Sequence, residues 1–195
     1  SVFCIQSLET GEEREFPTQY RRLAGPRWTR DGRVIIIATW DHNSRMSLCR
    51  VDVRTGEVSP VVVAGPDQAF RHHEIPGDGS LIYVRADRKS QAASIIHRDL
   101  ATGEEKELHQ GPPRNDVIMS LSPDRRRLAL LNRPAGQVDA ELIVRVMPVA
   151  GGDPREITRF KAPQSWFPLA WSADGRYLLF PRKMSLGDPD QNLWR

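Results

Sequence analysis

The chain has 195 residues, of which 39% are hydrophobic, and this proportion supports a folded core and excludes a disordered tail. Its 28 basic and 25 acidic residues leave a net charge of +3, and the basic residues are spread along the chain, which argues against a nucleic-acid-binding surface. Since the longest apolar run, residues 34–38, is short and no targeting pattern opens the sequence, we expect no membrane span.

Two series of turn motifs interleave along the chain at a constant offset. The first consists of Asp31-Gly32, Asp78-Gly79, Asp124-Arg125 and Asp174-Gly175. The second consists of Thr10-Gly11-Glu12, Thr55-Gly56-Glu57, Thr102-Gly103-Glu104 and a variant, Gly151-Gly152-Asp153. Because Asp-Gly between apolar runs is a strong hairpin signal, we expect type I′ turns with positive φ at both central residues in the first series.

These turns divide the chain into short expected strands. In the second repeat the strands cover residues 27–29, 33–39, 46–53 and 57–63, with a polar loop at 41–45. The third repeat contains strands at 81–85, 94–100 and 104–109, and the fourth at 127–132, 142–149 and 155–160. No stretch keeps a helical period without a Gly or Pro. Four strands in each ~45-residue repeat predict an all-β protein, a β-propeller built of four-stranded antiparallel blades.

The residues around the turns resemble those of a known family. Residues 26–33, 121–124 and 169–180 resemble the W-S-P-D-G-R-x-I-A-F signature of TolB-like, WD-repeat-like propeller blades, and residues 51–57 and 98–104 resemble the following V-D-x-x-T-G-E turn. The third repeat departs from the pattern, with Ile75 where the others place Trp28, Leu121 and Trp171. The resemblance covers essentially the whole chain. It implies the fold, a bacterial source and a periplasmic or extracytoplasmic location, but it does not decide the function.

The repeats predict one propeller domain over residues 1–195. We expect a half blade at 1–25, repeats at 26–70, 71–116 and 117–166, and another half blade at 167–195. Residues 2–5 and 192–195 both align with residues 47–50, so both ends fall in the third strand of a blade. Either the segment belongs to a larger propeller or it closes a four-bladed ring, and we favour the larger propeller. Open blade edges would then allow a homodimer.

Residues with catalytic or metal-binding chemistry are few. The sequence contains no G-x-S-x-G elbow, no phosphate-binding loop and no catalytic cysteine signature, so we expect neither an enzyme nor a cofactor site. His72 and His73 are adjacent on the expected innermost strand and point to opposite faces, so they cannot both hold one metal ion. Residues 188–192 begin like a calcium loop but lack its central Gly and closing Glu. We therefore expect no metal.

Two other groups of residues receive structural interpretations. Cys4 and Cys49 occupy equivalent repeat positions, which are too far apart for a disulfide, so we expect free, packed thiols. The cluster at residues 125–127, Arg-Arg-Arg, falls in a turn, and we interpret it as solvated. Trp28 and Trp171 are expected in the core, which leaves Trp40 and Trp166 as the exposed aromatic residues.

The sequence therefore predicts a non-catalytic TolB-like module that binds a protein or peptide partner. The expected surfaces are the channel and the loops between second and third strands, at residues 41–45, 87–91, 133–139 and 185–190. The candidate binding residues are Trp40, Asp41, His42, Arg45, His72, His73, Arg88 and Trp166. The alternatives are the substrate-gating propeller of a prolyl-oligopeptidase-type serine hydrolase, marked by an adjoining G-x-S-x-G elbow, and the sensor domain of a bacterial receptor-type kinase.

Overall fold

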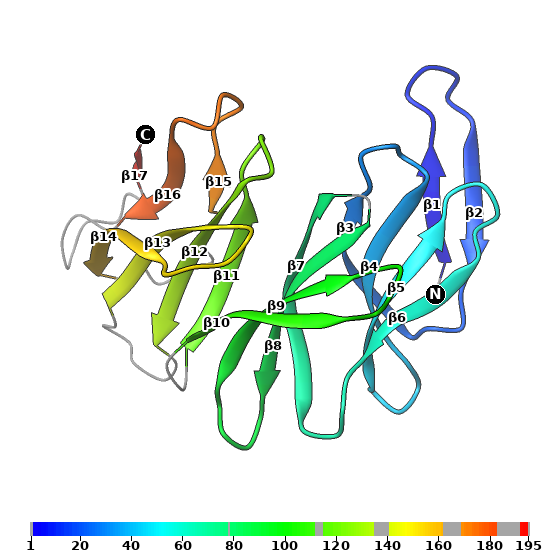
Figure 1. Ribbon diagram of the computed structural model, residues 1–195. Coiled ribbons are helices and arrows are strands. Elements are labelled where there is room, and N and C mark those ends of the chain that lie inside the picture. The colour runs from blue at the N-terminus through cyan, green and yellow to red at the C-terminus, as the bar shows by residue number, and fades with distance from the viewer. Residues whose placement is uncertain are drawn as a thin grey trace. The chain divides into compact units, whose positions relative to one another are not determined.

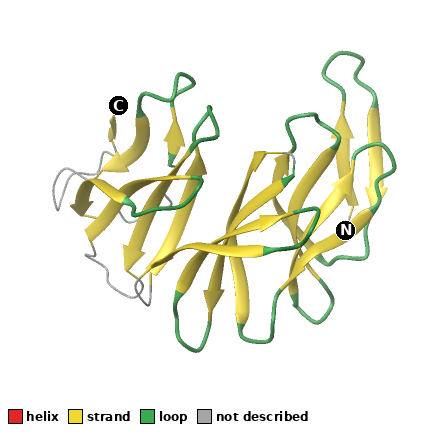
Figure 2. Ribbon diagram, in the orientation of Figure 1, coloured by secondary structure: helices red, strands yellow, loops and turns green. Residues whose placement is uncertain are grey.

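The computed structural model describes residues 2–77, 79–111, 115–134, 141–161, 169–182 and 192–194. All regular elements in these ranges are β-strands, and Figure 2 shows only strands and connecting loops. Over the same ranges, no helix is present that could cross a membrane. The chain divides into two compact units, Ser1–Phe70 and Arg71–Arg195.

The first unit contains two antiparallel sheets. One pairs β1 (Val2–Gln6) with β2 (Glu13–Pro17), and the other has the order β3 (Arg22–Trp28), β4 (Val34–Trp40), β5 (Met46–Asp52) and β6 (Val58–Val63). Phe3 and Ile5 of β1 pack against a cluster that includes Ile35, Ile37 and Cys49 of the β3–β6 blade. The run of β-branched residues in β4 suits a strand that is buried on both faces.

The second unit contains three antiparallel blades, which Figure 1 labels in chain order. The first blade is formed by β7 (Gln68–Gly77), which begins at the end of the first unit, β8 (Ser80–Asp87), β9 (Ala93–Asp99) and β10 (Glu105–Gly111). The second is formed by β11 (Asn115–Leu121), β12 (Arg127–Pro134), β13 (Glu141–Pro148) and β14 (Arg155–Lys161). The third is formed by β15 (Ala170–Trp171), β16 (Leu178–Arg182) and β17 (Asn192–Trp194). In each sheet, strands that are consecutive in sequence are neighbours.

The core of the second unit lies between successive blades. Ile82, Ile95 and Leu130 belong to a buried cluster shared by the β7–β10 and β11–β14 blades. Leu131 belongs to a different cluster, shared by the β11–β14 blade and the β15–β17 blade. Because neighbouring residues of β12 point to opposite faces, this one strand supplies side chains to both clusters. The all-β architecture of four-stranded antiparallel sheets agrees with the sequence prediction.

Three turns of the Asp-Gly series differ from the expected type I′ geometry, and the fourth includes Asp78, which lies outside the described residues. The three are four-residue loops, closed by the backbone bonds Thr29 N–H to Val34 O, Ser122 N–H to Arg127 O and Ser172 N–H to Tyr177 O. In the first of them the φ angle is positive at Gly32 but not at Asp31. The Asp31 carboxylate accepts the hydroxyl of Thr29 at 2.7 Å and the Arg33 N–H at 3.0 Å. The type I′ expectation was therefore wrong, because a four-residue loop requires only one left-handed residue. The aspartate holds the turn, as expected for a turn former.

The tryptophan expectations were correct only in part. Trp171 is half-buried, and its indole Nε1 donates to the Ser120 carbonyl of β11 at 3.1 Å. Trp28 holds the equivalent place in β3 but is 47% exposed. Trp40 is half-buried, and the Arg22 guanidinium lies 4.7 Å from its ring centre. Trp28, and not Trp40, is the more open aromatic residue of this unit.

Candidate functional site

The loop after β4 carries several of the predicted binding residues of the first unit. Asp41 accepts the backbone N–H groups of Asn43 at 2.9 Å and Arg45 at 2.8 Å. The Arg45 side chain is tied down as well, because its Nε donates to the Ala64 carbonyl at 3.1 Å. Trp40 ends β4 beside this loop, and His42 is exposed. The loop is thus held in one conformation by its own side chains.

The loop after β8 has the same design in the second unit. Asp87 accepts the N–H groups of Lys89 at 3.0 Å and Ser90 at 2.7 Å, and the Ser90 hydroxyl at 2.9 Å. These bonds, led by that from the Ser90 N–H, hold the pKa of Asp87 below its usual value. Arg88 is exposed at the loop tip. The carboxylate therefore stays ionised and keeps the loop ordered at neutral pH.

The remaining predicted residues do not join these loops. His72 and His73 lie in β7, where His73 is buried and His72 is half-buried, in keeping with side chains that alternate between faces. Trp166, residues 135–139, residues 185–190 and most of the calcium-like segment at 188–192 lie outside the described residues. The structure therefore brings Trp40, Asp41 and Arg45 together in one unit and places His72, His73 and Arg88 in the other.

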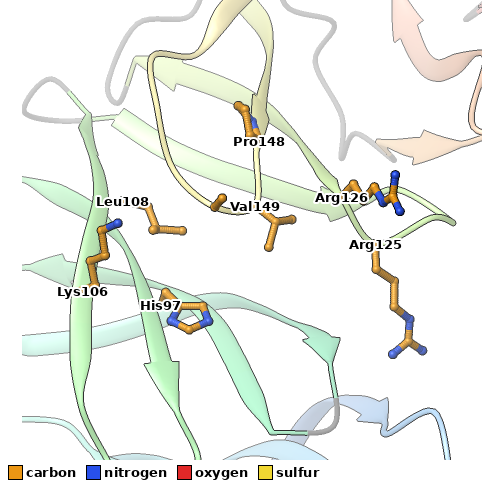
Figure 3. A pocket seen from close by; sticks show the side chains of 8 residues that line it. His97, Lys106, Leu108, Arg125, Arg126, Pro148 and Val149 are labelled. Carbon is orange, nitrogen blue, oxygen red and sulfur yellow. The ribbon is translucent and has the colours of Figure 1, made fainter.

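A pocket of about 460 Å³ lies between two blades of the second unit. We call it the interblade pocket, and its lining residues are His97, Lys106, Leu108, Arg125, Arg126, Pro148, Val149 and Ala150. Figure 3 shows the residues of β9 and β10 on one side and the two arginines on the other, with Val149 between them. Its volume falls within the usual range for small-molecule sites. The eight lining residues include several cationic side chains and no carboxylate.

Arg125 is the unusual residue of this pocket. It occupies the position that is Gly32 and Gly175 in other repeats, and its φ angle is +59°. A non-glycine residue in this conformation costs about 1–2 kcal/mol relative to an unstrained backbone. The Nη1 atom of Arg125 is buried and has no hydrogen-bond partner among the described residues. An unpartnered buried donor adds a further cost. The turn thus carries both backbone strain and an unsatisfied guanidinium nitrogen.

The interpretation of residues 125–127 as a solvated turn holds for Arg126 and Arg127, which are exposed, but not for Arg125, which is half-buried. Arg127 lies with its guanidinium 4.8 Å from the Trp171 ring centre and donates to the Gly175 carbonyl at 2.9 Å, which joins two blades. Arg125 lines the interblade pocket. Arg126 is exposed and also lines it. The sequence did contain a signal for Arg125, since it replaces the glycine of the repeat.

Glu105 precedes Lys106 of the interblade pocket, but its carboxylate is hydrogen-bonded to three other side chains. Its carboxylate accepts the Tyr83 hydroxyl at 2.6 Å, Arg85 Nη1 at 2.9 Å and Arg98 Nη1 at 2.9 Å. Burial alone would raise the pKa of Glu105, but these three donors hold it below its usual value of 4.5. Because adjacent residues of a strand point to opposite faces, Glu105 does not neutralise Lys106.

Replacing Glu105 with glutamine is expected to lower the free energy of unfolding at pH 7 by about 1–3 kcal/mol, because hydrogen bonds to a charged acceptor are lost. The depressed pKa means that this stabilisation is complete above about pH 4.5 and is lost as the pH falls through the folded-state pKa. Urea unfolding of the unmodified chain and of Glu105→Gln from pH 7 to pH 3 measures this stability difference, and Glu104→Gln, at an exposed residue, is the control. A stability difference that does not shrink in acid would contradict this account.

A group of potential metal ligands lies on the β1–β2 hairpin. Candidate ligand atoms of Cys4, Glu13 and Glu15 are within 4.8 Å of one another, and all three residues are exposed. Local desolvation and the charges of Glu15 and Glu13 raise the pKa of Cys4, so the thiol is protonated at neutral pH. Both cysteines are free, as predicted, and Cys49 is packed. Cys4 is exposed, against expectation, because it alternates with the inward-facing Phe3 and Ile5.

Comparison with known proteins gives fold neighbours only. No protein-family model and no curated protein matches the sequence. TolB from Acinetobacter baumannii is 19% identical with a TM-score of 0.65, over 91% of this chain and 42% of TolB. A structure from a study of two prolyl endopeptidases is 18% identical with a TM-score of 0.66, over 96% of this chain and 29% of the endopeptidase.

The β-propeller domain of the Trilobed protease from Pyrococcus furiosus is 12% identical with a TM-score of 0.59, over 91% of this chain and 55% of that domain. The chain spans less than two thirds of the length of each of these three proteins. Identities this low establish the fold alone. The chain therefore has the fold of a TolB-like β-propeller built of four-stranded antiparallel blades.

Proposed function

We propose that the chain is a non-catalytic module of a larger TolB-like propeller, and that it binds a protein or peptide partner through the loops between second and third strands. One observation carries this proposal. In each unit an aspartate, Asp41 or Asp87, already holds such a loop by two backbone hydrogen bonds. A preorganised loop loses little conformational entropy on binding, so more of the contact energy is retained as affinity.

The exposed side chains on these loops indicate the kind of partner. His42 lies on one loop, and Arg88 and Lys89 lie on the other, and all three are exposed. The cationic side chains of Arg88 and Lys89 on a rigid loop favour a partner segment that carries carboxylates. The proposed partner is therefore an acidic peptide segment or an acidic protein surface.

Peptides selected by display against the whole chain test the proposal, and Asp87→Ala is the informative variant. The substitution removes the bonds that order the loop, so we expect affinity for the selected peptides to fall by about tenfold. Asp99→Ala is a matched control. At the other end of β9, Asp99 accepts the same three kinds of bond, from Ala101 N–H, Thr102 N–H and the Thr102 hydroxyl.

Both variants lose equivalent turn contacts, so their thermal stabilities should fall by similar amounts. Binding should fall only for Asp87→Ala, as measured by isothermal titration calorimetry. Equal weakening by the two variants would contradict the assignment of the loop. Failure of a diverse library to yield any acidic peptide that binds the folded chain would contradict the proposed function itself.

A further inference from the structure

We propose that the interblade pocket binds the carboxylate of an aliphatic acid, with Arg125 as its principal ligand. The pocket lies at the ends of the blades that carry the β9–β10, β11–β12 and β13–β14 turns. The loop that contains Arg88 follows β8, at the opposite end of the β7–β10 blade. This site is therefore separate from the loops of the proposed function and does not depend on them.

The first argument is the unsatisfied Nη1 atom of Arg125. The residue is half-buried and lines the pocket, but its Nη1 atom is removed from solvent and has no partner among the described residues. A buried donor is costly unless an acceptor is supplied. Rotation of the Arg125 side chain would bring Nη1 to an anion bound in the pocket, and the planar fork of arginine matches a carboxylate.

The second argument is the charge of the walls. Lys106 comes from β10 and His97 from β9, while Arg125 and Arg126 come from the β11–β12 turn. In register, Lys106 is directly opposite His97, so both lie on the face toward the arginines. The eight lining residues include no carboxylate. Asp124 and Asp99 interact electrostatically with Arg126 and His97, so the positive potential of the pocket comes mainly from Lys106 and Arg125.

The third argument is the apolar part of the lining. Leu108 and Val149 border the buried cluster shared by the two blades, and Pro148 and Ala150 complete the apolar wall. Inorganic phosphate would leave this wall unused, whereas an aliphatic stem would bury it at about 25 cal/mol per Å². The occupant is therefore a carboxylate on an aliphatic stem, either a small acid or the C-terminus of a peptide with an apolar last residue.

The backbone of Arg125 provides an unusual test. Glycine at this position would relieve the positive φ, so Arg125→Gly removes the proposed ligand without straining the turn. We expect hexanoate to bind the unmodified chain by calorimetry and by amide chemical-shift changes at Lys106 and Val149. Arg125→Gln and Arg125→Gly should each weaken this binding by about tenfold or more, as expected for a lost charge-assisted pair. The thermal midpoint of Arg125→Gly should not fall.

The controls test separately the effect of the Arg125 charge, the need for an aliphatic stem, and the source of the carboxylate. Arg54→Gln, at an exposed turn of the first unit, removes the same charge and should leave hexanoate binding unchanged. Asp87→Ala should also leave it unchanged, so failure of this site and failure of the proposed function are distinguishable. Hexanamide, acetate and inorganic phosphate should each bind more weakly than hexanoate. Tighter binding of acetyl-Gly-Leu than of hexanoate would identify a peptide C-terminus as the source, and the reverse order a small acid.

Several results would overturn the assignment. Equal hexanoate affinity in the unmodified chain and Arg125→Gln would exclude Arg125 as the ligand. Phosphate or acetate binding as tightly as hexanoate would exclude the aliphatic carboxylate. The absence of any hexanoate-dependent shift at Lys106 and Val149 at millimolar concentration would exclude the site.

Discussion

Replacing Gly56 with alanine is expected to lower the free energy of unfolding by about 2–5 kcal/mol, a sum of left-handed backbone strain and overpacking. Gly56 has a φ angle of +74°, and a Cβ atom there would overlap Cδ1 of Phe16. The Phe16 ring would have to shift, which would disturb its stacking on Phe3 at 5.1 Å between ring centres. Urea unfolding followed by circular dichroism measures the loss.

Gly11 provides a matched control for this substitution. It occupies the equivalent turn of the β1–β2 hairpin with a φ angle of +72°, and a Cβ atom there would meet nothing within 4 Å. Gly11→Ala should therefore cost only the backbone strain, about 1–2 kcal/mol. Equal losses for the two variants would mean that the close approach to Phe16 contributes nothing to stability.

Truncating Leu130 to alanine is expected to cost about 2–5 kcal/mol, because the side chain is fully buried and leaves a cavity. Leu130 belongs to the cluster between the β7–β10 and β11–β14 blades. Leu131→Ala should cost a similar amount, since Leu131 is also fully buried, but its cluster joins the β11–β14 blade to the β15–β17 blade.

Hydrogen exchange distinguishes the two leucine variants. Leu130→Ala should accelerate amide exchange in β8 and β9, whereas Leu131→Ala should accelerate it in β15 and β16, because each variant loosens a different blade contact. The same set of accelerated amides in both variants would contradict the assignment of the two leucines to separate clusters.

The fold was predictable because its strongest signals are local. The turn motifs recur at a nearly constant spacing, and apolar runs between them form strands whatever the distant contacts are. The turn type was not predictable, since Asp31-Gly32 fits both a two-residue and a four-residue loop. The exposure of Trp28 was also missed, because burial depends on tertiary contacts and not only on the residues around Trp28 in the sequence.

The candidate site was less predictable than the fold. The ordered loops at Asp41 and Asp87 fall where the repeat predicted them, because they are repeat features. The interblade pocket arises from two blades, at residues that are distant in sequence, such as His97 and Val149. Only the replacement of glycine by Arg125 marks the pocket in the sequence, and interpreting this replacement required knowing that Nη1 of Arg125 is buried without a partner.

The strand order within each sheet also bears on synthesis. In the β3–β6, β7–β10 and β11–β14 blades every strand pairs with the strand before it in the sequence. Each blade can therefore complete its hydrogen bonds as soon as its own residues have left the ribosome, which takes only seconds at about 5–20 residues per second. The buried clusters that contain Leu130 and Leu131 can form only when the next blade is present. A nascent chain therefore passes through stages in which one blade face is exposed to chaperones.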